Sequence, residues 1–207
     1  VFHLAAIANP RKCQESMDET YRINIEGTKN VLSCCKNVGR LVFSSSITVY
    51  GGTFDSPISE SNILISHDAY SLAKQIGECL LKSYSSTSGL QYTILRNCNM
   101  YGPRQTTDYL VPSLISQGLK DGFVEVWDPT PIRDFVYITD AVSAFVGVAQ
   151  SESCINKSFN MGTGIGTSVG EVVKLISETL GVDWKDANKP QKVSPFLVAD
   201  NKSICNS

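Results

Sequence analysis

Three consecutive segments decide the fold: RLVFSSS at residues 40–46, HDAYSLAKQIGECLLKSYS at residues 67–85 and QYTILRN at residues 91–97. The first and third are short runs of β-favouring residues, which are typical of buried strands. The middle segment repeats apolar residues with the period of an α-helix, so that they form one stripe. A strand, a helix and a second strand in this order predict a βαβ unit with parallel strands.

The same alternation of apolar runs and helical segments continues through the rest of the chain. Short apolar runs predict strands at 1–6, 124–127, 134–138 and 157–161, and helical periodicity predicts helices at 13–38, 109–119, 138–150 and 168–180. Gly39 ends the first of these helices. We therefore expect an α/β fold built around a parallel sheet.

Length and charge bound the class of protein. The 207 residues suffice for one large domain, or for one domain with a small second lobe. A formal net charge of −2 and the lack of a basic run exclude an electrostatic nucleic-acid binder. No apolar stretch reaches the roughly 18 residues of a membrane span, so we expect no membrane partner.

The cysteines indicate a reducing compartment. There are seven, an odd number, and no C-x-x-C pair occurs. This pattern favours reduced thiols in a cytoplasmic protein over a disulfide framework or a zinc site. With His3 and His67 as the only histidines, we expect no metal site. Cys98 could be a catalytic nucleophile, but a packed small hydrophobe is the favoured interpretation.

Tyr70 and Lys74 carry the sharpest chemical signal. Residues four apart share one helix face, so the phenol and the ammonium point to one site. A free tyrosine has a pKa of about 10, and a neighbouring cation favours its phenolate, as a general base requires. Alone, this spacing is weak, since an exposed lysine beside a half-buried tyrosine would also produce it.

The serines at 44–46 strengthen that signal because they end a predicted strand. Ligands of open α/β sheets bind beyond the carboxyl ends of the strands. Ser46 could hydrogen-bond a substrate hydroxyl and relay its proton to Tyr70. For Ser44 and Ser45, a purely structural role at the strand end is the favoured interpretation.

Six segments occur together in a recognisable order. They are HLAA at 3–6, NIEGTKN at 24–30, FSSSITVYG at 43–51, YSLAK at 70–74, RNCNMYGPR at 96–104 and RDFVY at 133–137. Together they resemble the extended short-chain dehydrogenase/reductase family, in particular the nucleotide-sugar epimerases and dehydratases. The resemblance implies part of a Rossmann-type doubly wound parallel sheet, with a small C-terminal substrate-binding lobe. It divides the chain into a catalytic, NAD-binding part at 1–107 and a mainly sugar-nucleotide-binding part at 108–207.

The resemblance also assigns roles to individual residues. By similarity, the catalytic residues are Ser46, Tyr70 and Lys74. The cofactor-binding residues are Leu4, Ala5, Ala6, Asn24 and Cys98, together with Tyr70 and Lys74. The substrate-binding residues are Asn99, Leu110, Trp127 and Arg133, together with Ser46. Core packing would explain Leu110 and Trp127 equally well, and an ion pair with Asp134 would explain Arg133.

The residues after the catalytic serine bear on the reaction. Dehydratases of the family usually carry an acidic pair there, and the related decarboxylases a glutamate at the second position. This chain has Ile47 and Thr48, so the resemblance favours an epimerase that uses NAD and a UDP-sugar and passes through a 4-keto intermediate. The alternatives are an NAD(P)H-dependent 4-keto-sugar-nucleotide reductase or synthase, and a non-catalytic truncated isoform.

The glycine-rich turn that holds a dinucleotide's pyrophosphate is not recognisable. The nearest candidate is GTGIGT at 162–167, but it has Thr167 at the third glycine position and follows the catalytic segments. We expect the first βαβ units to precede Val1, and therefore weak or absent NAD binding by these residues alone. The resemblance further implies a homodimer formed through the helices at 13–38 and 67–88.

Overall fold

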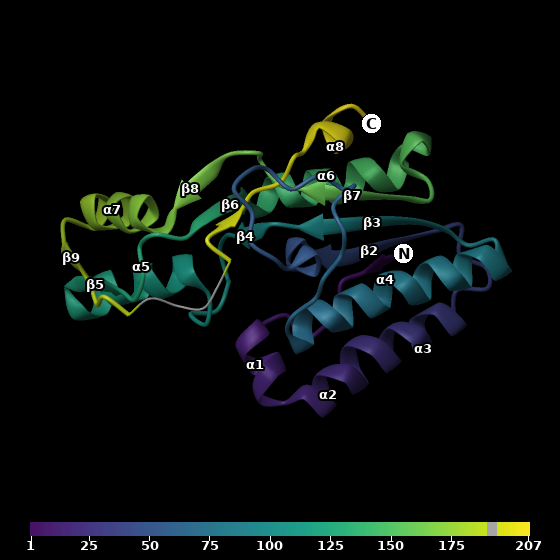
Figure 1. The fold of residues 1–207 in the computed structure, drawn as a ribbon, viewed down its shortest axis with the longest axis horizontal. Helices are drawn as coiled ribbons and strands as arrows, with labels where there is room; N and C mark the ends of the chain where they lie inside the picture. The colour runs from purple at the N-terminus through teal and green to yellow at the C-terminus, as the bar shows by residue number, and fades with distance from the viewer. Residues whose placement is uncertain (190–193) are drawn as a thin grey trace.

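A computed structural model describes residues 1–189 and 194–207 (Figure 1). The strands are β1 (Phe2–His3), β2 (Arg40–Ser46), β3 (Gln91–Asn97), β4 (Asn99–Tyr101), β5 (Phe123–Val126), β6 (Ile132–Tyr137), β7 (Lys157–Met161), β8 (Gly166–Ser168), β9 (Asp183–Asp186) and β10 (Phe196–Leu197). The α-helices are α1 (Pro10–Glu15), α2 (Met17–Tyr21), α3 (Gly27–Ser33), α4 (Ala69–Ser88), α5 (Leu110–Asp121), α6 (Ile138–Gln150), α7 (Val169–Leu180) and α8 (Lys202–Cys205). A π-helical segment spans Arg22–Glu26, and 3₁₀ turns span Ile47–Tyr50 and Glu152–Cys154.

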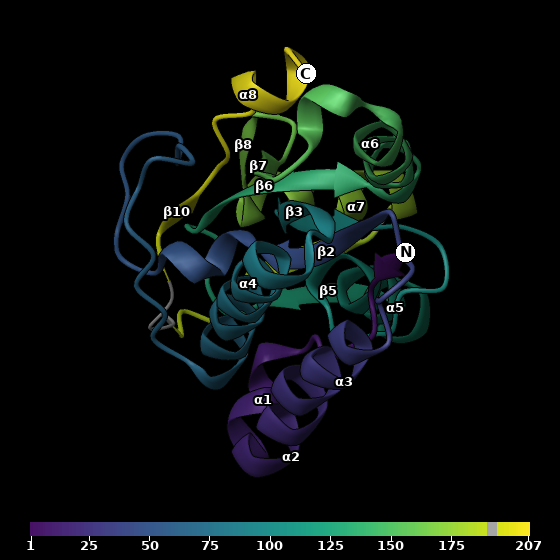
Figure 2. The same cartoon turned by 90° about the vertical axis from the view of Figure 1, so that its right-hand side faces the viewer.

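The main sheet is parallel and has the strand order β1-β2-β3-β7. Helices cover both faces: α4, backed by α1–α3, lies on one, and α6 lies on the other (Figures 1 and 2). This arrangement confirms the predicted α/β fold of Rossmann type with a doubly wound sheet. Because β2, β3 and their neighbours run in one direction, their carboxyl ends meet at one edge.

Two apolar cores hold the helices to this sheet. On the α4 side, Leu32, Leu41 and Ile94 belong to a buried cluster that joins α3, β2 and β3. On the α6 side, Phe145 and Phe159 belong to a larger cluster. The sheet is therefore covered by packed side chains on both faces, as its continuous apolar strands require.

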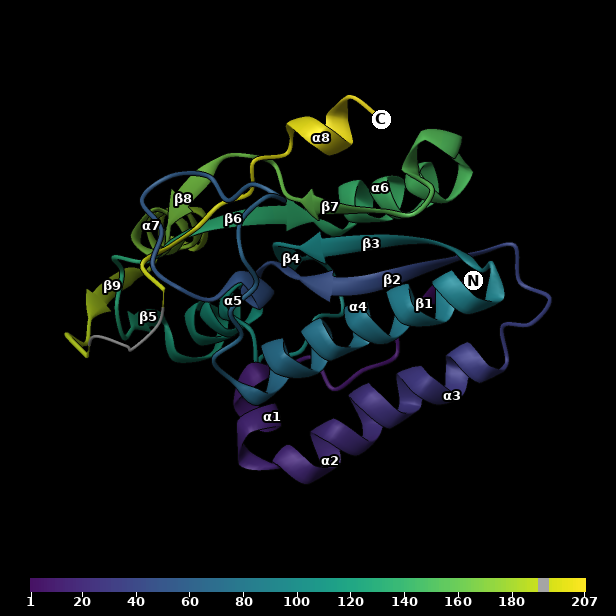
Figure 3. The same ribbon diagram turned by 45° about the vertical axis from the view of Figure 1, so that its right-hand side comes forward.

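A smaller lobe lies at the far end of the molecule (Figure 3). It consists of α5, α7 and the two-stranded parallel sheet β5-β9, packed around Val124 and Val173. A second small sheet of order β10-β6-β4, to which β8 adds antiparallel, links this lobe to the main sheet. The elements of this lobe fall within residues 108–207, for which substrate binding stays a prediction.

The prediction of one continuous helix at 13–38 was wrong. Helix α1 begins three residues earlier, where Asn9 caps it and Pro10 occupies its first turn. Ser16 has φ −135° and ψ 67°, which breaks the helix between α1 and α2. The chain then widens into the π-helical segment, and α3 ends at Ser33, well before Gly39. The strand predicted at 1–6 was too long, because only Phe2 and His3 pair with β2.

A buried polar network fixes α4 against the sheet. Arg96 on β3 donates from Nε and Nη2 to the Glu78 carboxylate at 3.0 and 2.7 Å, and from Nη1 to the Tyr50 hydroxyl at 2.6 Å. Ser45 Oγ donates to Glu78 at 2.6 Å. The Tyr50 hydroxyl in turn donates to Asn160 Oδ1 at 2.7 Å. Such a network sets the position of α4 relative to β2 and β3 because each group has a partner in the interior.

Candidate active site

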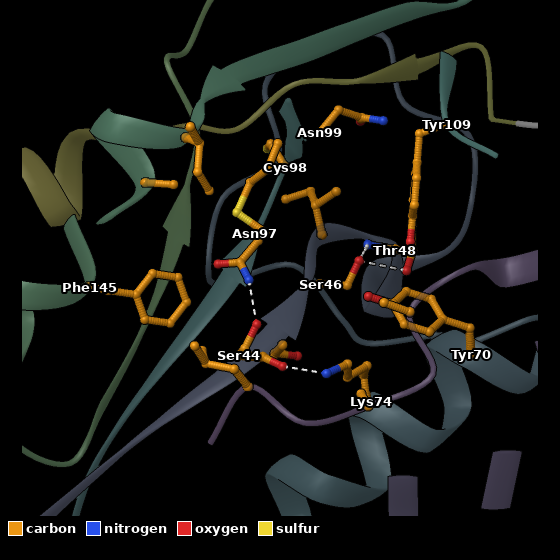
Figure 4. A pocket seen from close by; sticks show the side chains of 18 of the residues that line it. Ser44, Ser46, Thr48, Tyr70, Lys74, Asn97, Cys98, Asn99, Tyr109 and Phe145 are labelled. Atoms are coloured by element: carbon orange, nitrogen blue, oxygen red, sulfur yellow. Dashed lines mark hydrogen bonds between the residues drawn. The ribbon is translucent and has the colours of Figure 1, made fainter. Parts of the chain in front are cut away.

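A cavity of about 580 Å³ opens beyond the carboxyl ends of β1, β2 and β3 (Figure 4). One side of it carries the hydroxyls of Ser44, Ser46 and Tyr70 with the Lys74 ammonium. The opposite wall is apolar and comes from α6. Its position matches the place where open α/β sheets bind their ligands.

Helix α4 places Tyr70 and Lys74 in this cavity. Asp68 caps the helix: its carboxylate accepts from Ser71 N at 2.9 Å, and the Ser71 hydroxyl lies 3.3 Å from Asp68 N, which completes a capping box. Tyr70 therefore lies in the first turn and Lys74 one turn later. Both side chains face the end of β2, as their spacing predicted.

Ser46 lies between Tyr70 and Thr48. It caps the 3₁₀ turn at Ile47–Tyr50, where its Oγ accepts from Thr48 N at 3.3 Å and lies 2.9 Å from Thr48 Oγ1. The phenol of Tyr70 lines the same part of the cavity as the Ser46 hydroxyl (Figure 4). The structure thus brings the predicted serine and tyrosine together and adds Thr48, which is hydrogen-bonded to Ser46.

The ionisation of Tyr70 departs from expectation. Burial raises the pKa of Tyr70 to about 12, and the nearby Ser46 hydroxyl opposes this rise. The expected lowering by Lys74 does not occur in this arrangement, because burial dominates and the ammonium is directed elsewhere. Lys74 Nζ donates to the Ser44 carbonyl at 2.6 Å and lies 5.9 Å from the centre of the Tyr70 ring.

Lys74 is itself perturbed because it is 5% exposed. Desolvation lowers the pKa of Lys74 to about 8, against 10.5 for an unperturbed lysine. A structural role was favoured for Ser44. The residue lines the cavity, and its backbone carbonyl accepts the hydrogen bond from Lys74. Ser45 has the structural role expected of it, since it binds Glu78.

The stability of the protein should rise with pH between about pH 8 and pH 10 through Lys74. In this range the unfolded chain still holds the lysine proton, which the folded chain has released. The free energy of unfolding therefore increases with pH, by at most about 1.4 kcal/mol per pH unit. Above about pH 10 the gain is opposed, because Tyr70 loses its proton more readily in the unfolded chain. Urea unfolding of wild type and Lys74→Met at pH 7, 8, 9 and 10 would measure the difference. Parallel pH dependences in the two proteins would contradict it, and Lys174→Met at an exposed site of α7 is the control.

Asn24 acts on the wall of the cavity through the loop after β1. The residue is 4% exposed, and its side chain accepts from Ile7 N at 2.8 Å and donates to Ile7 O at 2.9 Å. The π-helical turn around it directs the amide to this loop. Leu4 and Ala6 of the loop line the cavity, whereas Ala5 and Asn24 do not. Asn24 therefore positions the wall of the site without lining it.

Replacing Asn24 with alanine should loosen this loop. The Ile7 N–H loses its partner and the Ile7 carbonyl keeps only the weak Cys13 thiol donor, which we expect to cost about 1–2 kcal/mol of stability. Hydrogen exchange at the Ile7 amide should accelerate more than exchange in β2 or β3. The control is Asn30→Ala, because Asn30 lies on an exposed face of the next helix. Unchanged exchange at Ile7 would show that the loop holds its shape without the clamp.

Cys98 lies in the cavity between β3 and β4, where its predicted position places it. It is 6% exposed, and burial raises the pKa of its thiol well above the ordinary value, with the Asp134 carboxylate adding to the effect. A thiol held in its neutral form is a poor nucleophile. The structure therefore supports the interpretation of Cys98 as a packed residue of the cavity wall.

The predicted substrate residues fall into two groups. Asn99 lines the cavity, and the parallel register places it opposite Phe135 on β6. Arg133 lies two residues before Phe135, so both side chains leave the same face of that strand. Leu110 packs on the core of the small lobe, and Trp127 is 52% exposed at its surface. These last two residues and Arg133 are outside the set that lines the cavity.

The glycine-rich segment at 162–167 surrounds an internal carboxylate. Asp134 is fully buried, and its two oxygens accept from Thr163 N at 2.7 Å, Thr163 Oγ1 at 2.7 Å and Gly164 N at 2.9 Å. A methyl group at position 162 would collide with this carboxylate. The segment is therefore not a phosphate-binding turn, as its sequence position indicated. Asp134 is committed to this loop and not to an ion pair with Arg133.

Sequence reasoning missed most of the apolar wall and several polar residues, among them Thr48, Asn97 and Gln105. Ala141, Val142, Phe145 and Val146 of α6 line the cavity, and Val142 and Val146 are 53% and 43% exposed. Their helical spacing looks like a core stripe, so no pattern marks them as a binding surface. Asn97 also lines the cavity. It precedes Cys98 at the end of β3, a position that could have drawn notice.

Two further features concern what the described residues do not contain. Within 1–189 and 194–207, no helix is both long and apolar enough to cross a membrane. The same residues hold no group of three or more side chains suited to bind a metal ion.

Comparisons with known proteins identify relatives of this chain in sequence and in structure. A family model described as the NAD dependent epimerase/dehydratase family matches residues 1–162. The chain is 32% identical over 185 residues to an uncharacterised UDP-glucose epimerase of Bacillus subtilis, covering 87% of this chain and 58% of that protein. It is 32% identical over 208 residues to a UDP-N-acetyl-alpha-D-glucosaminuronate decarboxylase of Bacillus cytotoxicus, covering 94% and 64%. A UDP-glucose 4-epimerase of Thermotoga maritima, solved with UDP-glucose, matches with a TM-score of 0.92 at 30% identity, covering 100% and 69%. The chain thus spans less than two thirds of the length of these curated relatives.

Proposed function

Because the chain belongs to the NAD-dependent epimerase/dehydratase family, we propose that it catalyses the epimerisation of a nucleotide-activated sugar at C4. UDP-sugars are the proposed substrates, since relatives in two reaction classes and a solved neighbour act on or bind them. The family membership confirms the resemblance drawn from the six sequence segments. The choice among the reactions of the family rests on the cavity.

The observation that carries this proposal is the composition of the cavity wall. Among the described residues that line it there are two phenols (Tyr70 and Tyr109), an ammonium, several hydroxyls and amides, but no carboxyl group. Ile47 and Thr48 occupy the positions after Ser46, and Ile47 is 2% exposed. Removal of a hydroxyl from the sugar requires an acid to protonate it. A site with Tyr70 as its proton-transfer group supports reversible oxidation of an alcohol instead.

Tyr70 and Ser46 would perform the proton transfer. The two hydroxyls line the same part of the cavity, so a sugar hydroxyl seated between them can pass its proton to Tyr70 directly or through Ser46. Since burial raises the pKa of Tyr70 to about 12, the phenolate needs a positive charge close by. Within a cavity of low polarity such a charge acts strongly. Lys74 holds the adjoining Ser44 carbonyl and lies against the ring of Tyr70.

The cavity fits the nicotinamide end of NAD. When bound, NAD⁺ supplies the acceptor for the hydrogen that leaves the sugar carbon, and a positively charged ring. Phe145 and the aliphatic residues of α6 offer an apolar wall to one face of such a ring. Lys74 would hold the adjacent ribose. The described residues contain no free glycine-rich turn for the pyrophosphate, since the loop at 162–167 encloses Asp134.

Asn99 and Arg133 are the proposed ligands of the sugar nucleotide's diphosphate. They lie on neighbouring strands of the β4–β6 pair, where an amide and a guanidinium can reach the same group. A guanidinium offers a planar pair of donors suited to phosphate oxygens. Leu110 and Trp127 on the adjoining lobe would line the nucleotide end.

A product analysis distinguishes the reactions. The full natural chain that carries these residues is incubated with NAD⁺ and UDP-glucose, UDP-N-acetylglucosamine or UDP-glucuronic acid, and the products are followed by proton NMR. An epimerase gives the C4 epimer with no net change in NADH absorbance. Net oxidation of NAD(P)H with a 4-keto sugar nucleotide would establish the reductase alternative, and a pentose product would establish a decarboxylase. Absence of turnover despite NAD⁺ binding would favour a non-catalytic protein.

We also propose a homodimer formed through α2, the π-helical segment and α4. A groove on their outer face is lined by Tyr21, Ile25, Leu72 and Ile76, and Leu72 is 38% exposed. Helix α4 carries Tyr70 and Lys74 on its inner side, so a partner on its outer face would brace the site. Sedimentation equilibrium would show a dimer mass, and a monomer at all concentrations would exclude it.

The seven cysteines support a cytoplasmic location. All are free, and Cys13, Cys35, Cys98 and Cys154 are buried. Free thiols in this number are typical of proteins in reducing compartments.

A further inference from the structure

Among the described residues that line the cavity, two have a buried amide oxygen without a partner, Asn97 and Gln105, and Asn97 is the one at the end of β3. Asn97, at the end of β3, is 6% exposed, and its side chain lines the cavity. Its Nδ2 donates to Ser44 Oγ at 2.8 Å, whereas its Oδ1 is buried and accepts no hydrogen bond. A buried amide oxygen without a donor is costly, and most such atoms in native proteins are paired. The position therefore calls for a donor from a ligand.

The surroundings of Asn97 place that donor beside the proposed reacting atoms. The parallel register sets Asn97 opposite Ser46 on β2, so the two side chains emerge from neighbouring strand ends. Ser44 joins Asn97 to Lys74, because its hydroxyl contacts the amide and its carbonyl contacts the ammonium. The free oxygen points away from Ser44 toward the side of the cavity where Phe145 lies (Figure 4).

The chemistry of nicotinamide supplies a matching donor. Its carboxamide is attached to the ring carbon next to the reacting one, so it must lie within a few ångströms of the sugar atom that faces Ser46 and Tyr70. We propose that Asn97 Oδ1 accepts a hydrogen bond from the carboxamide N–H of the cofactor and thereby sets the orientation of the nicotinamide ring. This inference rests on the proposed function, since it requires NAD in the cavity.

The test compares two dinucleotides that differ in this donor. In 3-acetylpyridine adenine dinucleotide a methyl group replaces the amide nitrogen, while the carbonyl is kept. Calorimetric titration of the full natural chain should show that NAD⁺ binds roughly fivefold to tenfold more tightly than the analogue. In Asn97→Leu, which has a similar volume and no acceptor, this preference should disappear, mainly through weaker NAD⁺ binding.

Each remaining outcome has a defined meaning. Equal affinities of the wild type for both dinucleotides, or a preference that persists in Asn97→Leu, would overturn the assignment. A loss of UDP-glucose affinity in the variant with the dinucleotide preference intact would place the oxygen on the sugar and overturn it as well. Failure of the wild type to bind either dinucleotide would instead contradict the proposed function. Thermal unfolding checks the fold of Asn97→Leu, and Asn97→Ala replaces it if the larger side chain prevents folding.

Discussion

Replacement of Tyr70 by phenylalanine is expected to lower turnover about one-hundredfold to ten-thousandfold, the range usual for loss of a positioned general base. The variant keeps the ring that lies beside Lys74 and removes only the phenolic hydroxyl, which lies near Ser46. Affinities for NAD⁺ and for the UDP-sugar should therefore stay within about threefold of wild type, since the interaction removed is made mainly in the transition state. Steady-state kinetics and calorimetric titrations on the same preparation would measure both quantities.

The matched control for this change lies on the same helix. Tyr84 is a half-buried residue of α4 that packs against the core on the α3 side, away from the cavity. Tyr84→Phe makes the same chemical change and should retain activity within about twofold, because a tyrosine outside the site has no part in proton transfer. Equal losses in the two variants would point to a general effect on α4. Full activity of Tyr70→Phe would exclude Tyr70 as the base.

Replacement of Arg96 by methionine is expected to produce the largest loss of stability, about 3–5 kcal/mol. Arg96 and Glu78 are 4% and 1% exposed at their side chains, and the pair is bidentate. Removing the guanidinium leaves the Glu78 carboxylate buried with Ser45 and the more distant Lys82. It also removes a donor to the Tyr50 hydroxyl. Denaturant unfolding would measure the loss as a shift of the transition midpoint.

Two companion variants distinguish the effect of breaking the buried Arg96–Glu78 pair from the effect of removing any charged side chain. The double variant Glu78→Gln with Arg96→Met should recover part of the lost stability, because no buried charge is then left without its partner. Arg11→Met breaks a surface pair whose side chains are 81% and 59% exposed, and should cost no more than about 0.5 kcal/mol. An Arg96→Met variant as stable as Arg11→Met would show that the network is not a source of stability.

The sequence predicted the long, regular elements well. Helix α6 at 138–150 and strand β7 at 157–161 have the predicted bounds, and α4 differs by a few residues. These predictions succeeded because packing within the sheet or against it sets the apolar spacing of both elements. The prediction of a helix at 13–38 failed for the opposite reason. The π-helical turn within that segment carries Asn24, which binds Ile7 in the loop after β1, and no local pattern records that contact.

The candidate site was predictable where its residues follow strands or share a helix face. Ser46, Tyr70, Lys74, Cys98 and Asn99 all line one cavity, as expected from their segments. The apolar wall from α6 was not predictable, because binding surfaces and core stripes have the same periodicity. Asn97 could be assigned to the site only from the structure, which shows its unpaired side-chain oxygen. The roles of these residues remain predictions until ligands are bound.

The parallel register of the main sheet has a consequence for folding kinetics. Ser46 and Asn97 lie side by side although a loop and the whole of α4 separate them in the chain, and Met161 pairs with Asn97 across a still longer separation. Chains dominated by such non-local pairings fold slowly, since large loops must close before the contacts form. The cavity exists only after β2, β3 and β7 have aligned. Recovery of ligand affinity during refolding would therefore report the last stage of sheet assembly, later than the regain of helical signal from α4.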